Sequence, residues 1–247
     1  MAAASALTIA GLAAAALAPA AESASPSLTG TVTYTTTTVT NTESGTDTKS
    51  GTETQTVTMN IKMSRRPAAH YWQVEDNGSS YTAKYTMTST ALERSADGTV
   101  NCTTTHSASA TAGGKLPKRP TSTTAPVLFA DITPGTSALN AKTKQIGLSP
   151  ILGYKGEDTT TYAGSGISPC EPGTFTDPIT GNFRPTNDSR QVCFPPGTSA
   201  KGASPTSSLI GAWKNNKKTF VFDCTNTYDD GNGGKVTATV SGSLKLK

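Results

Sequence analysis

Charged residues and histidines are scarce in this chain of 247 residues, and their scarcity excludes several classes of function. Charged residues make up 15% of the sequence, so it is not a disordered polyelectrolyte. The net charge of +4 comes from scattered Lys and Arg, which is too diffuse for a nucleic-acid-binding surface. The two histidines, His70 and His106, do not have the spacing of a metal-binding pair, and no G-x-S-x-G motif marks a nucleophilic serine. We therefore expect no catalytic residue, no metal ion and no cofactor.

Long apolar segments are absent as well, with one exception at the start. Residues 2–18 form an uncharged, Ala-rich run, and Ala18-Pro19-Ala20 then supplies the small residues that signal peptidase requires. Alanine is barely apolar enough for a membrane span, and Pro19 ends the run. We expect residues 1–20 to be a signal peptide. Residues 21–247 would then be a single exported domain, secreted or periplasmic, with no membrane span after cleavage.

Proline is absent between Ser27 and Arg66, which argues against a glycosylated, extended stalk even though this stretch is rich in threonine. Threonine is β-branched and favours strands. Apolar or small residues recur at every second position from Leu28 to Tyr34 and again from Val57 to Met63. This period of two predicts a β-hairpin, with the polar segment from Glu43 to Glu53 as its long, mobile loop.

Turn signals continue the pattern along the chain. Asp76-Asn77-Gly78 and Ala96-Asp97-Gly98 separate alternating runs, which predicts a meander of about five strands in the first half. Proline and glycine then recur from about 112 to 207, where only 127–132 and 145–154 look ordered. We expect a long loop-rich insert here, with a few short strands and a large excursion between the third and fourth cysteines.

The last stretch, from about Leu209 to Lys247, predicts three antiparallel strands. Pairing Tyr228 with Val236 places Phe222 opposite Gly242, and an aromatic ring over a strand glycine helps to fix the register. No helical period of useful length follows the first 20 residues. We therefore expect an all-β fold, either an antiparallel β-sandwich or a partly closed barrel of about ten strands that carries the loop-rich insert.

Four cysteines in an exported chain predict disulfide bonds. No two of them have C-x-x-C spacing, so a metal site is not indicated. Of the three possible pairings we favour Cys102–Cys224, because both fall on the apolar faces of predicted strands. Cys170 and Cys193 share one segment rich in proline and glycine and form the second predicted bond. The first bond would clasp the two halves of the chain over a common core.

The composition favours a non-enzymatic protein with a binding or structural role outside the cytoplasm. Tyr71, Trp72, Tyr81 and Tyr85 can form a platform that stacks on a ligand, although core packing explains their alternation equally well and is the interpretation we favour. The expected partner is an extracellular carbohydrate or protein, and not nucleic acid. The alternative is a secreted hydrolase whose site lies in the loop-rich insert.

Overall fold

The computed structural model of this chain describes residues 27–65, 71–74, 78–116, 127–131, 145–164, 170–183, 209–214, 218–229, 231 and 233–247. The regular elements of these residues are strands: β1 (Ser27–Ser44), β2 (Asp47–Arg65), β3 (Tyr71–Val74), β4 (Ser80–Arg94), β5 (Val100–Lys115), β6 (Val127–Asp131), β7 (Gln145–Gly164), β8 (Gly173–Phe183), β9 (Leu209–Lys214), β10 (Thr219–Asp229) and β11 (Gly234–Leu246). Within the described residues, no helix is long and apolar enough to cross a membrane. The expected signal peptide, residues 1–20, lies outside them.

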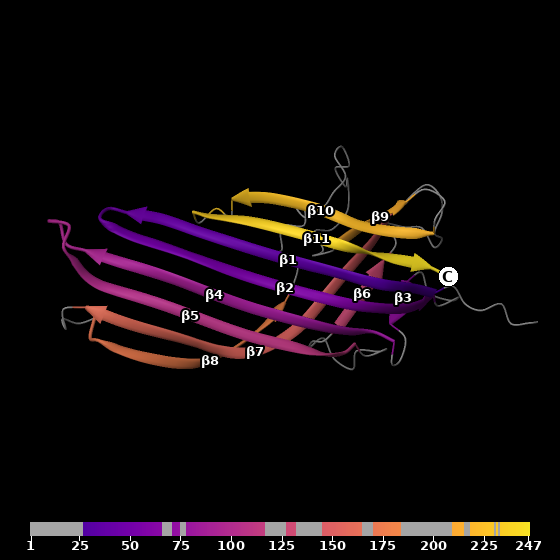
Figure 1. Cartoon of the computed structure of the whole chain (residues 1–247), viewed down its shortest axis with the longest axis horizontal. Coiled ribbons are helices and arrows are strands. Elements are labelled where there is room, and N and C mark those ends of the chain that lie inside the picture. Colours follow the sequence, from indigo (N-terminus) through magenta and orange to yellow (C-terminus); the bar gives the residue numbers. More distant parts are fainter. Residues whose placement is uncertain are drawn as a thin grey trace, which may run out of the picture.

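The eight longest strands form one antiparallel sheet in the order β8-β7-β5-β4-β2-β1-β11-β10. Figure 1 shows these strands lying side by side along the long axis of the molecule. These eight strands by themselves do not close into a barrel, because the outermost two, β8 and β10, do not pair with each other. The expectation of an all-β, antiparallel fold is therefore confirmed, in the form of one continuous sheet.

The short strands β3, β6 and β9 extend this sheet at one end only, on the right in Figure 1. β3 pairs with β2 and β6, β6 pairs with the first part of β7, and β9 pairs with both β7 and β10. At this end, which we call the packed end, successive pairings lead from β1 through β2, β3, β6, β7, β9, β10 and β11 back to β1. We call the other end, where the β1–β2 and β4–β5 turns lie, the open end.

Alternation along the strands divides the sheet into an inner face, which carries the hydrophobic core, and an outer face. The largest fully buried side chains lie on the inner face toward the packed end, and they are Leu28, Tyr34, Met59, Met63, Leu148, Leu152, Phe183, Leu209, Phe220, Phe222 and Leu244. On the outer face, cross-strand threonine pairs share hydrogen bonds, such as Thr33 with Thr58 at 3.2 Å and Thr225 with Thr239 at 3.2 Å. Threonine therefore serves both requirements of these strands, since it is β-branched and its hydroxyl pairs with its neighbours.

The predicted register of the closing hairpin is confirmed. Tyr228 pairs with Val236, Phe222 pairs with Gly242, and Phe222 is only 1% exposed. The Phe222 ring, however, covers a different glycine, because a Cβ atom on Gly211 of β9 would collide with that ring. Gly242 has a φ of +128°, and a side chain there would collide with the backbone of Thr31 in β1. Gly242 thus permits the close approach of β1 and β11 rather than providing a surface for the ring.

The predicted loop between Glu43 and Glu53 is wrong. β1 and β2 continue through this segment as a regular ladder up to the pair Ser44 and Asp47, so the turn contains only Gly45 and Thr46. The segment is polar because both of its faces are largely accessible, not because it leaves the sheet. Polar composition therefore did not distinguish a loop from a strand that lies beyond the core.

Within the region 112–207, the order predicted near 127–132 and from Gln145 is confirmed by β6 and β7, but the loop predicted for 155–164 and 173–183 is wrong. β7 runs for 20 residues instead of ending near Tyr154, and it pairs with β8 from Leu152–Phe183 to Tyr162–Gly173. Residues 117–126, 132–144, 165–169 and 184–208 lie outside the described part of the chain. The described strands of this region are an integral part of the sheet, and β8 forms one of its edges.

The meander predicted for the first half differs in one connection. β3 does not form a hairpin with β4, since both strands pair with β2: β3 near Met63 and β4 from Thr48 to Asn60. The hairpin across Asp97 is confirmed, and the β4–β5 register shifts only between Glu93 and Arg94.

Candidate functional site

Toward the open end the inner face continues beyond the core, and its side chains form regular rows. The register places Met87, Ala108, Asp158 and Asp177 side by side across β4, β5, β7 and β8. The next row toward the open end consists of Ser89, His106, Thr160 and Phe175, and the row after it contains Tyr162. We call Met87, Ser89, His106, Asp158, Thr160, Tyr162, Phe175 and Asp177 the open-end site.

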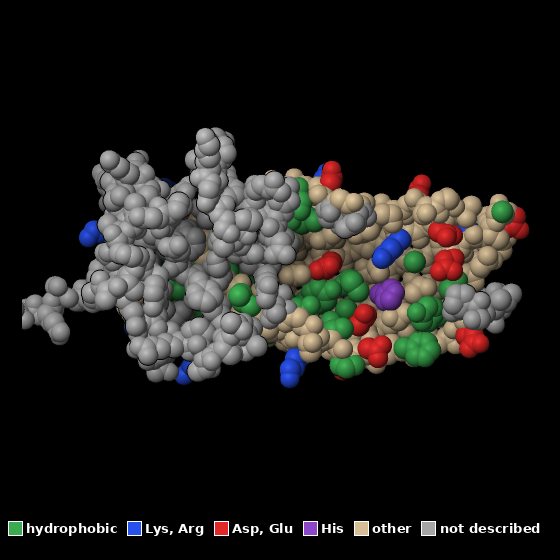
Figure 2. Space-filling view, turned by 180° about the vertical axis from the view of Figure 1, so that it is seen from behind, with side chains coloured by type: hydrophobic (Ala, Val, Ile, Leu, Met, Phe, Trp, Pro, Cys, Tyr) green, Lys and Arg blue, Asp and Glu red, His purple; other side chains and the backbone are tan. Residues whose placement is uncertain are grey.

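Figure 2 shows this face from behind: hydrophobic and acidic side chains, the histidine and, beside it, a Lys or Arg side chain lie on the part away from the grey atoms. The opposite face carries the threonine pairs. The two faces of the same strands therefore differ in chemistry, and core packing does not account for the difference.

His106 is held in place by a neighbouring hydroxyl. The Oγ1 atom of Thr160 and the Nδ1 atom of His106 lie 2.9 Å apart and share a hydrogen bond. A hydroxyl beside an imidazole is one component of a nucleophilic site, but such a site also needs an orienting acid and oxyanion donors. Among the described residues no carboxylate bonds to the imidazole, and the strand amides here are engaged in the ladder. The pair therefore fits ligand binding better than nucleophilic catalysis.

Aromatic rings border the site on both sides. Phe175 is 59% exposed although it is large and apolar, and its ring lies edge-on to Tyr162 with the centroids 6.0 Å apart. On the core side, Tyr154 stacks on Tyr85 at 5.5 Å and contacts Phe183 at 4.7 Å. Phe175 and Tyr162 form an accessible aromatic surface, whereas Tyr85, Tyr154 and Phe183 lie at the boundary of the core.

Two carboxylates face each other across β7 and β8. Asp158 and Asp177 are directly opposite on the inner face, an arrangement of like charges that is unfavourable by itself. The Oδ1 atom of Asp158 is buried and has no hydrogen-bond partner within the described part of the chain. A third carboxylate, Glu53, accepts a hydrogen bond of 2.9 Å from Gln55.

The pKa of Tyr85 reflects the acidic side chains that lie near it. The pKa of Tyr85 is raised to about 12, mainly by burial and in smaller part by the nearby Glu53, Tyr154 and Asp158. Burial, followed by Glu53, also raises the pKa of Tyr154. Negative charge on the inner face thus raises the pKa values of the Tyr85 and Tyr154 hydroxyls, which lie between the core and the open-end site.

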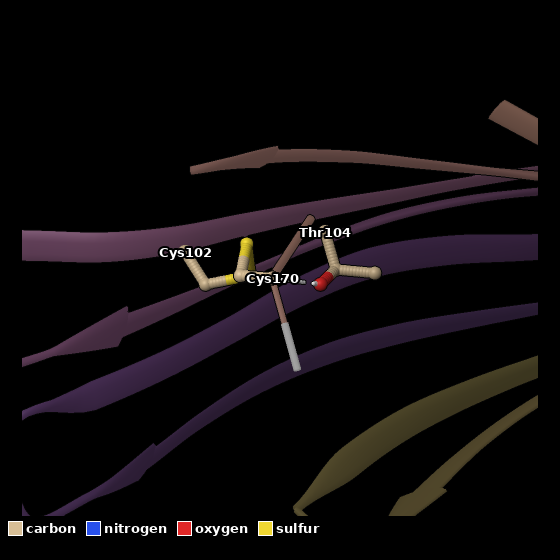
Figure 3. Close-up of a disulfide and its surroundings, with 3 residues drawn as sticks. All are labelled: Cys102, Thr104 and Cys170. Carbon is tan, nitrogen blue, oxygen red and sulfur yellow. Dashed lines mark hydrogen bonds between the residues drawn. A yellow bond between two sulfur atoms is a disulfide. The ribbon is translucent and has the colours of Figure 1, made fainter. Parts of the chain in front are cut away.

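The predicted disulfide pairing is wrong, and the observed bond borders the open-end site. Cys102 bonds to Cys170 with a Cα–Cα distance of 5.6 Å, and each cysteine is 3% exposed. Figure 3 shows this bond next to Thr104, whose Oγ1 atom lies 3.9 Å from the Cys102 sulfur. Opposite Cys102, the absence of a side chain at Gly164 makes room for the Cys170 sulfur.

The predicted bond between Cys102 and Cys224 fails because of distance across the sheet. In one direction round the sheet β4, β2, β1 and β11 separate β5 from β10, and in the other β7 and the short β9 separate them. Cys224 and Tyr34 both pair with Val240 of β11, which places Cys224 toward the packed end of the sheet. Cys102, in contrast, lies at the open end of β5. Cys224 is disulfide-bonded as well, and Cys193 lies outside the described residues.

Of the four residues predicted as a possible ligand platform, the structure describes the side chains of two, Tyr81 and Tyr85. Tyr81 and Tyr85 are 7% and 8% exposed and belong to the core, which is the interpretation that the sequence favoured. The side chains of Tyr71 and Trp72 lie outside the described part of the structure, as does His70; only the backbone of the first two is placed, in β3.

The sequence analysis missed Phe175, Asp177 and Tyr162 because it treated their segment as loop. Alternation of Gly173, Phe175, Asp177 and Ile179 with threonine was the available signal. Pro178 obscured it, although a proline is compatible with an edge strand.

Two other features carry less chemistry. A shallow hollow of about 390 Å³ lies near the turn of the β1–β2 hairpin, and it is lined by Asn41, Thr42, Glu43, Thr48, Lys49 and Ser50. Within the described residues, no group of three or more His, Cys, Asp or Glu side chains is arranged to hold a metal ion.

Comparison of the chain with protein-family models, with curated proteins and with solved structures finds no match. The site's chemistry is therefore the basis for any functional conclusion.

Proposed function

We propose that the protein is an exported binding protein that captures an extracellular ligand on the inner face of its open end. The observation that carries this proposal is the accessible aromatic pair of Tyr162 and Phe175, which shares one sheet face with His106 and the two facing aspartates. Ligand sites combine aromatic surface with a few convergent polar groups, and this is the place in the described structure where both occur.

Two features of the fold support a rigid site of this kind. The Cys102–Cys170 bond attaches the segment before β8 to β5 and so holds the edge strand that carries Phe175. Disulfides form in oxidising compartments, which agrees with the export that the first 20 residues predict. The finer architecture we propose is a partly closed barrel, in which the packed end is the closed part and the open end is the mouth.

Defined arrays of glycans and of peptides, probed with the labelled mature protein, test the proposal. We expect at least one array member to bind, and Phe175→Ala to weaken that binding about tenfold, as loss of an aromatic contact would. Val39→Ala is the matched control, because Val39 is 40% exposed but lies on the outer face. Equal binding by both variants and the parent protein, or no binding to any array member, would overturn the proposal.

The second candidate function is a secreted hydrolase, with the hydrogen-bonded pair of His106 and Thr160 as its reactive groups. Thr160 and Asp158 belong to the region in which the sequence analysis placed a hydrolase site. Hydrolysis of array members, lost in Thr160→Val and kept in Phe175→Ala, would favour this candidate. Release of ligand without cleavage would favour the binding protein.

A further inference from the structure

We propose that the ligand of the open-end site is a saccharide that carries free amino groups. This inference rests on the proposed binding function and specifies the ligand's chemistry. Its three supports are the acidic side chains of the inner face near the open end, the accessible aromatic pair and the hydroxyl groups on the same face.

Near the open end, the described charged side chains of the inner face are mostly acidic, whereas the whole chain is basic. The chain has a net charge of +4, yet Asp158, Asp177 and Glu53 all lie on the inner face near the open end. Among the described lysines, only Lys49 shares this face and this end by register. The lysines of neighbouring strands, such as Lys84 and Lys155, alternate to the outer face. This segregation complements a cation.

An ammonium group relieves the unfavourable arrangement of the two aspartates. Asp158 and Asp177 are opposite each other, and Asp158 has a buried oxygen without a hydrogen-bond donor among the described residues. A protonated amine has three donors and can bond to both carboxylates at once. An aromatic ring next to such a group adds a cation–π contribution, and Phe175 lies one row away on the same face.

The remaining groups of the face favour a sugar over a purely aliphatic amine. Thr160 places a hydroxyl between Tyr162 and Asp158 on β7, and Ser89 and Thr104 add hydroxyls to the same face on β4 and β5. Hydroxyls and an imidazole can donate to and accept from the hydroxyls of a saccharide, while the exposed ring of Phe175 covers its apolar face. A ligand with alternating hydroxyl, amino and C–H surface satisfies all of these groups together.

Isothermal titration of the full mature chain with three short oligosaccharides of equal length tests the inference. The probes are a glucosamine oligomer, its fully N-acetylated form and a glucose oligomer, all at a mildly acidic pH that keeps the amine protonated. We expect the glucosamine oligomer to bind at least about tenfold more tightly than the other two, since a hydrogen bond to a charged group is worth that much.

Asp177→Asn should remove most of this preference and weaken binding of the glucosamine oligomer about tenfold. Glu157→Gln is the matched control, because it removes an equal charge from the outer face of the neighbouring strand and should leave binding unchanged. Asp177 is exposed, and circular dichroism will verify that both variants fold.

The outcomes separate this inference from the proposed function. Equal binding of the free and N-acetylated oligomers would overturn the inference that the site recognises a free amino group. The array and Phe175→Ala results would still support a binding protein. Tighter binding of a lysine oligomer than of the glucosamine oligomer would overturn the inference that the ligand is a saccharide. Weakening by Glu157→Gln equal to that by Asp177→Asn would show nonspecific attraction and would also overturn the inference.

Discussion

The packed end and the open end are built from the same strands, yet their inner faces have different compositions. β4 illustrates the change, since Tyr81, Ala83 and Tyr85 are buried in the core, whereas Met87 and Ser89, further along the same face, are only partly buried. The backbone ladder does not change between the two ends. Strand pairing therefore does not require a core under every residue.

The difference shows which side chains need a functional explanation. At the packed end, alternation of apolar residues is fully accounted for by burial, at about 25 cal/mol per Å² of apolar surface removed from water. At the open end, an exposed phenylalanine and two opposed aspartates bring no such gain. Residues that neither bury apolar surface nor pair with opposite charge are candidates for ligand contact.

The largest effect is expected for the stability of the packed end, and it can be compared with that of the open end by truncating one phenylalanine at each end. Phe222→Ala should lower the free energy of unfolding by about 3–5 kcal/mol, because it leaves a cavity in the core. Phe175→Ala should change that free energy by less than about 0.5 kcal/mol, because its ring is exposed. Urea denaturation followed by circular dichroism measures both values. A Phe222→Ala midpoint equal to that of the parent would contradict the assignment of the packed end.

The disulfide gives the next largest effect and tests whether the open end is coupled to the rest of the sheet. Replacing Cys102 and Cys170 together by serine should cost about 2–4 kcal/mol, because the bond closes a long loop in the unfolded chain. Thermal unfolding measures the loss. Peptide mapping without reduction should yield a fragment joining Cys102 to Cys170 and, by elimination, one joining Cys193 to Cys224. A fragment joining Cys102 to Cys224 would contradict the structure.

The packed end was predictable from sequence because burial leaves a period-two signature. Phe220, Phe222, Val236 and Val240 alternate with polar residues, and this pattern specified both the faces and the register of the closing hairpin. The glycines were harder to interpret. A strand glycine can face a ring or another backbone, and only the spatial arrangement shows that Phe222 covers Gly211.

Apart from the β4–β5 hairpin, the open end was not predictable because burial does not select its residues. Between Glu43 and Glu53, and again along β8, polar and small residues form regular strands that resemble loops in composition. The disulfide partner of Cys102 was equally hidden, since alternation gives the face of a cysteine but not its neighbour across the sheet. The candidate site therefore emerged from the register of four strands, two of which lie in the supposed insert.

A smaller effect concerns Tyr85, which lies at the border between the two ends. Its folded-state pKa of about 12 is above the ordinary value of 10.0, so the folded protein resists ionisation that the unfolded chain undergoes. The stability that Tyr85 provides is complete below pH 10 and decreases as the pH rises toward 12. Tyr85→Phe should reduce this decrease, as measured by urea denaturation over that pH range. An ultraviolet titration in which no tyrosine ionises above pH 11 would contradict the burial of Tyr85.

The smallest effect belongs to the β4–β5 turn at the tip of the open end. The hydroxyl of Ser95 donates to Asp97 at 2.6 Å and the amide of Thr99 donates at 2.9 Å, and these bonds hold the pKa of Asp97 at about 2. Because this pKa lies below the ordinary value of 3.8, the contribution of Asp97 is present above about pH 4 and is lost as the pH falls toward 2. Thermal unfolding of Asp97→Asn should therefore differ slightly from the parent at pH 5, and the difference should disappear near pH 2. Other carboxylates titrate in the same range, so the comparison is between the two proteins at each pH, with Glu157→Gln as the control for loss of an exposed charge. A difference that persists unchanged at pH 2 would mean that the charge of Asp97 does not stabilise the turn, and that the open end depends on its backbone ladder alone.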